Sequence, residues 1–593
     1  MLKQLNHNGI LVPQVPLPSR LELVIRGERK GLSPAQIEMA LAWARKQGTP
    51  YVQDPLFVRN FLHDFSAALG VEPPLTIDEV DFGPALDIVQ AERAAKERLT
   101  PEERKALAAQ RKAERERLKE QYGHAIVDGQ RVEIGSYIAE PSGIFMGRGK
   151  HPLRGRWKQG PRQCDVTLNL SPDAPVPPGD WAEVVWEPES LWVARWKDKL
   201  SARLKYVWLS DTAPVKQERE AAKFDRAVNL GVNLAQVRAH IEQGLTSPRA
   251  KRRKVATACY LIDALCLRVG DEKDPDEADT VGATTLRPEH VTLHPDGTAE
   301  FKFLGKDSVL WHKTIPLPPL VMQNLDDLIR EARPPASANN GKRLDVPIRA
   351  TRDKPQIFPG VDSSDVNAYL SEALPGLTAK VFRTYHATQA VRDSLSAAEV
   401  EASDPPYKKW GAISLANLEA AVLCNHYKAA PANWRDRRQR ASERRQRLEE
   451  RVAACRSPVR QASEALKALQ QEAREKKNGA RTGAQRERLQ ARYAKKIEKA
   501  GKKVETARGK LERAEATLGK ARTQDTIAAR GRTWNLGTSL KSYIDPRVLY
   551  QWGQQVEYDV LALYYPKALQ RKFAWVSEQE QSEQTEPQPG DSG

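Results

Sequence analysis

Five residues suited to phosphoryl transfer without a metal lie along the chain in the order Arg268, Lys306, Arg383, His426 and Tyr543. Arginine, lysine and histidine side chains can bind and protonate a phosphodiester, whereas a tyrosine hydroxyl can attack it. About a hundred residues of basic sequence separate His426 from Tyr543. A group of cations with a distant nucleophile indicates DNA cleavage through a transient covalent bond.

Taken singly, each of these residues also has an ordinary structural explanation. Arg268 closely precedes Gly270 at the end of a predicted helix, where the helix dipole favours any cation. Lys306 falls in a predicted turn, and His426 ends an apolar run in which a core histidine is common. Tyr543 could equally be a half-buried aromatic. The interpretation as a reaction centre therefore depends on the five occurring together.

The charge of the chain indicates a polyanionic partner. The 593 residues carry a formal net charge of +17, and nucleic acid is the first candidate, with an acidic membrane surface second. Residues 435–532 contain 30 Lys and Arg against 13 Asp and Glu, which accounts for the entire excess. Elsewhere the charges balance, so a DNA groove there requires uneven placement of both signs.

Several classes of protein are disfavoured by missing patterns. The five cysteines form no CxxC pair and are odd in number, so we interpret them as reduced core residues of an intracellular protein. No apolar run approaches the roughly 20 residues that span a bilayer, and Met1 is not followed by a signal-peptide core. HExxH, EF-hand and P-loop patterns are missing from the sequence, which agrees with chemistry that needs neither a metal nor a nucleotide cofactor.

Two patterns in the first third of the chain predict specific elements. The run T-P-E-E at Thr100 combines an N-cap, a proline at the first helical position and a glutamate at the third, and predicts a helix over Pro101 to about Tyr122. Residues 125–209 are rich in alternating apolar and polar residues. V-T-L-N-L at Val166 and W-A-E-V-V-W at Trp181 flank a proline-rich turn, and the alternation predicts a half-buried antiparallel sheet.

Two further patterns place the candidate residues of the middle of the chain. A helical stripe over Val255 to Val269 stops at Gly270, which we expect to be its C-terminal cap. Two alternating runs surround Gly305-Lys306-Asp307 and predict a hairpin with Lys306 in its tight turn. Lys380 and Arg383 are three residues apart, so both should lie on one face of a helix.

The segment after Pro431 has the clearest periodicity. Apolar residues alternate steps of four and three over Leu448 to Ala473, and a second such series covers Leu489 to Leu518. A glycine-containing break at Asn478 should fold the two helices into an antiparallel coiled-coil hairpin. Pro458 could kink the first helix, or cap and restart it. The acidic, glutamine-rich tail from Ser577 is expected to be disordered.

Together, these motifs resemble those of the type IB DNA topoisomerases. C-L-R-V-G-D-E-K, F-L-G-K-D-S, L-T-A-K-V-F-R-T-Y-H-A-T, L-C-N-H and L-G-T-S-L-K-S-Y-I-D-P-R are similar to that family's catalytic blocks and follow the family's order. E-P-S-G-I-F-M-G-R-G-K-H-P at Glu140 is similar to the DNA-contacting block of its cap, and F-A-W near the C-terminus also matches. The resemblance extends from about Asn6 to Trp575.

The resemblance implies a role for each residue of the series. Tyr543 would attack a backbone phosphate and leave a 3′-phosphotyrosine with a free 5′-hydroxyl. Arg268, Arg383 and His426 would donate hydrogen bonds to the non-bridging oxygens, and Lys306 would protonate the departing 5′ oxygen. Supercoiled double-stranded DNA would be relaxed without a cofactor. Further DNA contacts are implied at Arg148, Lys150, His151, Lys205, Tyr206, Lys273, Asp307, Lys380 and Ser542.

The implied fold is a multidomain α+β clamp around duplex DNA, acting as a monomer without membrane attachment. A mixed α/β DNA-binding cap would occupy residues 1–210, and a mainly helical catalytic core residues 211–431. An antiparallel coiled-coil linker would follow at 432–532, and a helical C-terminal domain at 533–593 would carry Tyr543 and the acidic tail. Because Tyr543 lies beyond the linker, that last domain must pack back onto the catalytic core.

Two departures from the family pattern and two rival functions leave alternatives open. Ser542 occupies a position where eukaryotic members usually have asparagine, so binding of camptothecin-type inhibitors is undecided. The long charged N-terminal extension of nuclear members is absent, which favours the cytoplasm or nucleoid of a prokaryote or archaeon over a nucleus. A tyrosine recombinase shares the chemistry but usually has His-x-x-Arg where this chain has K-V-F-R at Lys380. A non-enzymatic DNA-binding clamp would fit the charge alone.

Overall fold

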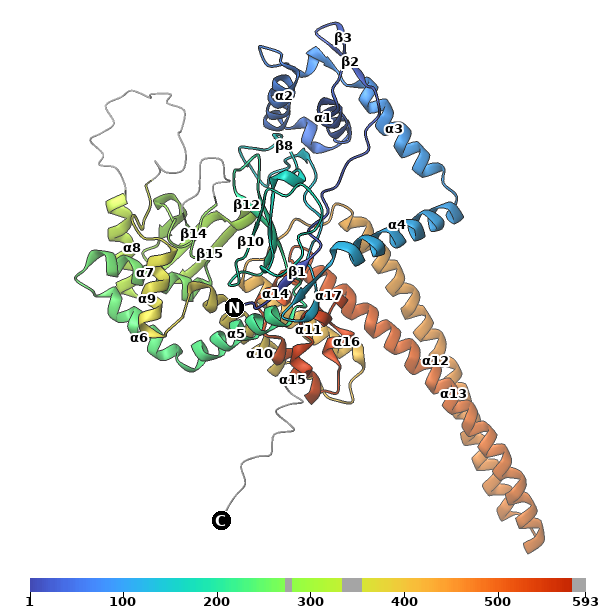
Figure 1. The fold of residues 1–593 in the computed structure, drawn as a ribbon. Coiled ribbons are helices and arrows are strands. Elements are labelled where there is room, and N and C mark those ends of the chain that lie inside the picture. Colours follow the sequence, from blue (N-terminus) through green and yellow to red (C-terminus); the bar gives the residue numbers. More distant parts are fainter. Residues whose placement is uncertain (272–279, 333–354, 579–593) are drawn as a thin grey trace. The chain divides into compact units, whose positions relative to one another are not determined.

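Figure 1 shows the computed structural model of the chain, which describes residues 1–271, 280–332 and 355–578. The fold is mixed α/β and divides into two compact units. The first contains Met1–Ile262, Arg268–Ala379 and Arg571–Trp575, and the second contains Asp263–Leu267, Lys380–Gln570 and the chain from Val576 onward. The predicted acidic tail lies outside the described residues from 579 onward.

The first unit begins with three helices packed on a small sheet. Helices α1 (Pro34–Ala44), α2 (Pro55–Leu69) and α3 (Gly83–Arg98) share a core with strands β2 (Glu22–Ile25) and β4 (Val80–Asp81). The exposed strand β3 (Glu28–Gly31) completes the sheet, whose order is β3-β2-β4. The Trp43 ring stacks on Phe61 in this core, with centroids 4.6 Å apart. The Asp54 carboxylate caps the start of α2, and Gly70 ends it in the left-handed conformation.

Helix α4 (Pro101–Tyr122) has the ends that the sequence predicts. The Thr100 hydroxyl accepts the N–H of Glu103 at 3.2 Å, and the Glu103 carboxylate accepts the N–H of Thr100 at 2.8 Å. This reciprocal pair satisfies two N–H groups that have no partner within the helix. No side chain of α4 is buried, as expected for a helix that is charged on all faces.

Two sheets form the next part of the first unit. One contains β1 (Leu5–His7), β5 (His124–Val127) and β6 (Gln130–Glu133); the other has the order β10 (Glu183–Val185), β9 (Val166–Asn169), β11 (Trp192–Lys197) and β12 (Leu204–Trp208). The predicted antiparallel sheet is confirmed for β9, β11 and β12 and is wrong for β10, which pairs with β9 in parallel. The long proline-rich connection returns the chain so that β10 runs in the same direction, and β11 is the antiparallel neighbour of β9.

The rest of the first unit contains a three-stranded sheet and several helices. β13 (Val291–Leu293), β14 (Thr298–Gly305) and β15 (Val309–Pro316) are antiparallel, and the predicted hairpin of β14 and β15 is confirmed. The predicted end of the helix at Gly270 is wrong: α7 ends at Leu265, because Cys266 has a φ of +53°. The helices are α5 (Pro214–Val232), α6 (Leu234–Leu245), α7 (Ala250–Leu265), α8 (Pro319–Ala332) and α9 (Ser363–Ala373).

The second unit is helical in the part that the structure describes. Its two longest helices, α12 (Trp434–Asn478) and α13 (Gly483–Arg530), lie side by side in Figure 1 as the orange hairpin. Val452, Ala514 and Leu518 from the two predicted apolar seams are buried between them. α12 continues through Pro458 and does not restart there. The other helices are α10 (Ala379–Ser396), α11 (Pro406–Leu423), α14 (Leu536–Ser542), α15 (Pro546–Gln555), α16 (Val560–Leu563) and α17 (Lys567–Lys572).

Candidate functional site

Arg268 lies in an extended segment held by a close approach of two glycines. The Arg268 carbonyl accepts the N–H of Ala283 at 2.9 Å. Beside this bond, Gly270 has a φ of +87°, and a Cβ added to it would lie 2.7 Å from the Cα of Gly282. Only glycine fits both positions, so the two glycines fix the backbone that carries the half-buried Arg268. The Asp271 carboxylate accepts the N–H of Ser363 at 2.9 Å, at the start of α9.

Lys306 is exposed at the tip of the β14–β15 hairpin. The two residues that follow it, Asp307 and Ser308, have φ values of +65° and +58°, which side-chain-bearing residues rarely adopt. The N–H of Val281 donates to the Leu304 carbonyl at 2.8 Å. The segment that bonds to Arg268 therefore also holds the strand that leads to Lys306, and the first unit brings Arg268 and Lys306 into one region.

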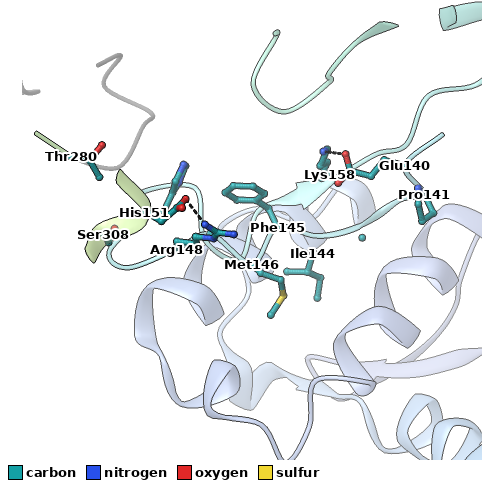
Figure 2. A pocket seen from close by; sticks show the side chains of 13 residues that line it. Glu140, Pro141, Ile144, Phe145, Met146, Arg148, His151, Lys158, Thr280 and Ser308 are labelled. Atoms are coloured by element: carbon teal, nitrogen blue, oxygen red, sulfur yellow. Dashed lines mark hydrogen bonds and ion pairs between the residues drawn. The ribbon is translucent and has the colours of Figure 1, made fainter. Parts of the chain in front are cut away.

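The predicted cap motif lies against this hairpin. Strands β7 (Gly143–Ile144) and β8 (Trp157–Lys158) form a short ribbon, and the loop between them carries Arg148, whose guanidinium pairs with the Asp307 carboxylate. A Cβ on Gly149 would lie 2.4 Å from the Ser308 hydroxyl oxygen, so glycine permits this contact. Loop and hairpin together border a pocket of about 550 Å³, shown in Figure 2.

The same pocket contains ionisable groups from three parts of the first unit. Figure 2 shows Arg148 and His151 near Ser308 and Thr280, with Lys158 and Glu140 at the other end. The His151 ring lies edge-on to Phe145, with centroids 4.9 Å apart. Burial raises the pKa of the Asp198 carboxyl, but the hydrogen bond and positive charge of Lys158 and the hydrogen bonds from Ser201 together outweigh burial and lower this pKa to about 2. Lys158 is therefore held by a permanently charged partner.

The remaining predicted DNA contacts are scattered over several elements. Lys205 and Tyr206 are neighbours in β12, so their side chains project to opposite faces of the sheet. Lys150 is exposed, and Lys380 is exposed in the first turn of α10. Ser542 is the last residue of α14. Lys273 lies outside the described residues.

In the second unit, Arg383, His426 and Tyr543 come together. Arg383 is 4% exposed on α10. Its guanidinium donates to the carbonyls of Cys266 and Cys424 at 2.5 and 2.8 Å, and its Cζ lies 5.1 Å from the centroid of the Tyr543 ring. In the part of the chain that the structure describes, no carboxylate pairs with this guanidinium. Within these described residues, carbonyl dipoles and a π face compensate the positive charge.

His426 lies beside the same tyrosine ring, with centroids 5.3 Å apart and an interplanar angle of 36°. It follows the end of α11, where its N–H donates to the Ala421 carbonyl at 2.8 Å and its carbonyl accepts the N–H of Asn535 at 2.7 Å. Both His426 and Tyr543 are buried. The bond to Asn535 joins this turn to the segment that enters α14.

The chain returns to this place after the long hairpin, as the sequence analysis requires. Tyr427 and Trp534 form an antiparallel bridge. This bridge brings the segment that enters α14 next to the turn that carries His426. The Tyr543 N–H then donates to the Ser539 carbonyl at 2.9 Å.

Among the described residues, no group of three or more His, Cys, Asp or Glu could hold a metal ion. None of the helices in this part of the chain has the length and apolar character needed to span a bilayer.

Asn417 is a buried site residue that the sequence analysis does not identify. Its amide donates to the Leu536 carbonyl at 3.2 Å, and its side-chain carbonyl accepts the Ser539 hydroxyl at 2.6 Å. These two bonds anchor α14, the helix that ends at Tyr543. The available signal is a single asparagine within the apolar run I-S-L-A-N-L-E-A-A-V-L.

Comparisons with known proteins match nearly the whole chain. Three family descriptions fit successive parts: "Eukaryotic DNA topoisomerase I, DNA binding fragment" residues 2–209, "Eukaryotic DNA topoisomerase I, catalytic core" residues 212–459, and "C-terminal topoisomerase domain" residues 515–584. The chain is 34% identical over 433 residues to DNA topoisomerase 1 beta of Arabidopsis thaliana. The aligned region covers 72% of this chain and 44% of the relative. It is 32% identical over 450 residues to DNA topoisomerase 1 of Candidozyma auris, covering 74% and 57% respectively.

The human mitochondrial DNA topoisomerase I is 33% identical over 452 residues, covering 74% of this chain and 71% of the relative. The chain spans about half the length of the plant and yeast relatives. The prediction of a prokaryotic or archaeal cytoplasm is contradicted, because the plant, yeast and mammalian relatives point to a eukaryotic protein. The chain belongs to the eukaryotic DNA topoisomerase I family.

Proposed function

We propose that this protein is a type IB DNA topoisomerase, which relaxes positive and negative supercoils by cutting and resealing one strand without ATP or a metal. The observation that carries the proposal is the cluster of Arg383, His426 and Tyr543. Among the described residues this buried guanidinium has no carboxylate partner, and beside the tyrosine ring it provides an anion site next to a nucleophile. Family membership supports the same reaction, and the description of residues 2–209 as a DNA binding fragment supports duplex DNA as the substrate.

In this reaction the Tyr543 hydroxyl gives its proton to solvent water as its oxygen forms a bond to a backbone phosphorus, and the bond from that phosphorus to the 5′ oxygen breaks. Arg268, Arg383 and His426 donate hydrogen bonds to the non-bridging oxygens, where negative charge builds up in the transition state. Lys306, at the exposed tip of its hairpin, gives a proton to the departing 5′ oxygen. Since one phosphodiester replaces another of similar energy, the step reverses without ATP.

The domain division extends this proposal. Residues 1–210 act as the DNA-binding cap, 211–431 as the catalytic core, 432–532 as the coiled-coil linker, and 533–593 as the C-terminal domain that supplies Tyr543. The cap and core hold duplex DNA as a clamp while the cut strand rotates around the intact one. All five reacting side chains come from one chain, so a monomer suffices. Binding of camptothecin-type inhibitors needs a test of its own, because Ser542, just before Tyr543, replaces the asparagine that eukaryotic members usually have.

The test is relaxation of negatively and positively supercoiled plasmid in EDTA without ATP, comparing the intact protein with Tyr543→Phe. We expect relaxation by the intact protein alone, together with a protein–DNA adduct at a 3′ end after denaturation with detergent. Tyr543→Phe should bind the same plasmid with unchanged affinity. An intact protein that does not relax DNA, or a Tyr543→Phe variant that does, would refute the proposal.

Two further readouts separate the alternative functions. A recombinase would join strands from two different labelled duplexes, whereas a topoisomerase reseals the strand that it cuts. A non-enzymatic clamp would bind duplex DNA but form no adduct with either variant. Affinity should fall steeply between about 50 and 200 mM salt, because phosphate contacts release bound counterions.

A further inference from the structure

Helix α10 contacts the nucleophile segment at two separate places. Arg383, in its first half, lies under the ring of Tyr543. Thr388, five residues further along the helix, contacts the backbone on both sides of Ile544. One rigid helix thus touches both the reacting side chain and the main chain that carries it.

The hydroxyl of Thr388 makes two hydrogen bonds to this segment. It donates to the carbonyl oxygen of Tyr543 at 3.2 Å and accepts the N–H of Asp545 at 3.0 Å. A threonine in a helix interior commonly bonds instead to the carbonyl four residues earlier in its own helix. Both bonding functions of Thr388 are directed to another element, at the turn between α14 and α15.

The turn that Thr388 contacts is buried. Ile544 is fully buried, and Asp545 is 3% exposed, with its carboxylate accepting the Arg547 guanidinium at 2.8 Å. The carbonyl of Tyr543 and the N–H of Asp545 lie on either side of Ile544. A side chain that holds both groups fixes the two peptide planes that flank Ile544. The first of these planes contains the Cα of Tyr543, from which the phenol projects.

We propose that Thr388 is a positioning residue for strand cleavage, which fixes the backbone of Tyr543 relative to Arg383 on the same helix. The inference rests on the proposed function and assigns Thr388 no contact with DNA. Displacement of a reacting atom by about 1 Å can cost roughly 100-fold in rate. Loss of the Thr388 hydroxyl therefore slows cleavage while DNA binding is unaffected.

The test compares Thr388→Val and Thr388→Ser with the intact protein. Valine keeps the shape and loses both hydrogen bonds, whereas serine keeps the hydroxyl and loses only a methyl group. The matched control is Thr384→Val, one turn earlier on α10, where the side chain is 1% exposed and its hydroxyl makes no hydrogen bond in the described part of the chain. The substrate is a duplex oligonucleotide whose cut end diffuses away, at saturating protein, so that single-turnover cleavage is measured.

We expect Thr388→Val to cleave about 10- to 100-fold more slowly, with an unchanged dissociation constant for the same oligonucleotide. Thr388→Ser and Thr384→Val should cleave within about threefold of the intact protein. If Thr388 acted only through helix packing, loss of its methyl group in Thr388→Ser would slow cleavage as well. Wild-type cleavage by Thr388→Val overturns the inference, as does slow cleavage by Thr388→Ser. If Thr388→Val does not fold, Thr388→Ala, which also removes the hydroxyl, takes its place with the same expected loss of cleavage. Failure of the proposed function is distinguishable, because the intact protein itself would then not cleave.

Discussion

Arg383 lies against Tyr543, with its guanidinium carbon 5.1 Å from the centroid of the phenol ring. The same guanidinium donates to the carbonyls of Cys266 and Cys424. Each carbonyl belongs to a turn with a strained residue, since Cys266 has a φ of +53° and Asn425 a φ of +52°. Left-handed backbone costs a side-chain-bearing residue roughly 1–2 kcal/mol. Arg383 therefore supports two turns of the candidate site and also faces the proposed nucleophile.

This double role predicts that Arg383→Lys is not conservative. A lysine ammonium is a single point donor and cannot reproduce two fixed N–H directions towards two carbonyls. We expect cleavage to fall about 10²- to 10³-fold, together with a lower melting temperature. Single-turnover cleavage and thermal unfolding measure the two effects. Arg392→Lys, at an exposed position of the same helix, should change neither, and wild-type cleavage by Arg383→Lys would disprove the double role.

The glycine pair beneath Arg268 predicts that Gly282→Ala is damaging. A Cβ there would lie 2.5 Å from the Gly270 Cα and 2.7 Å from the Val269 carbonyl, both backbone atoms that no rotamer change can move. We expect a loss of about 1–3 kcal/mol in the free energy of unfolding and slower cleavage through displacement of Arg268.

The control for this prediction is Gly31→Ala in β3, where nothing lies within 4 Å of the added Cβ. Denaturant titration and single-turnover cleavage of both variants are the measurements. If Gly282→Ala and Gly31→Ala are equally stable, the segments that carry Gly270 and Gly282 can move apart without loss of folding free energy, and the prediction is wrong.

Local sequence patterns predict the elements here better than their connections. The T-P-E-E run at Thr100 contains all that α4 needs at its start, and the apolar seams define the hairpin of α12 and α13 because both depend on near neighbours. The pairing of β9 and β10 depends on how a long connection is routed, which alternation does not encode. Similarly, α7 stops at Cys266 rather than Gly270, where a distant arginine holds the carbonyl.

The candidate site shows the same limit. Each of the five proposed reacting residues is found from its motif, because these residue types have few other reasons to occur in that order. Asn417 and Thr388 are not found, since each bonds to a main-chain group more than a hundred residues away. A hydrogen bond to a backbone group leaves no trace in the sequence of the partner.

The buried His7 predicts acid sensitivity of the first unit. Burial lowers its pKa from 6.5 to about 4, against the opposing hydrogen bond to the Asn169 carbonyl. The folded state therefore resists protonation that the unfolded chain accepts, so stability is lost as pH falls from 6.5 towards 4. The loss for one such group is roughly 3 kcal/mol at most over this range.

His7→Gln should remove this part of the pH dependence, because the amide cannot gain a proton. The measurement is the melting temperature of both proteins between pH 4 and 7. The contributions of other acid-sensitive groups cancel when one melting temperature is subtracted from the other. His63→Gln, at a position on α2 where the imidazole side chain is 59% exposed, serves as the control and should follow the intact protein. Parallel curves for the intact protein and His7→Gln would contradict the assignment.

The basic hairpin of α12 and α13 predicts an effect on strand rotation rather than on cleavage. Glu449 and Arg522 face each other across the hairpin at 2.8 Å, so residues 450–521 can be replaced by a short glycine-rich turn that leaves the base paired. The removed segment has 20 Lys and Arg against 9 Asp and Glu. Its positive charge should attract the rotating duplex and slow it. The shortened protein should release more supercoils per cleavage event, bind DNA more weakly and show a flatter salt dependence.

Charge can be separated from bulk in the full-length hairpin. Arg451, Lys499, Lys502, Lys503 and Lys510 line a groove of about 500 Å³ without an acidic residue. Replacing Lys499, Lys502 and Lys503 by glutamine keeps the helices and lowers the charge by three. If friction is electrostatic, this variant should rotate faster, in the same direction as the shortened protein, with single-turnover cleavage within about threefold of the intact protein. Single-molecule rotation under tension measures the rate. Loss of cleavage on shortening the hairpin would show that α12 and α13 instead hold Tyr543 in place.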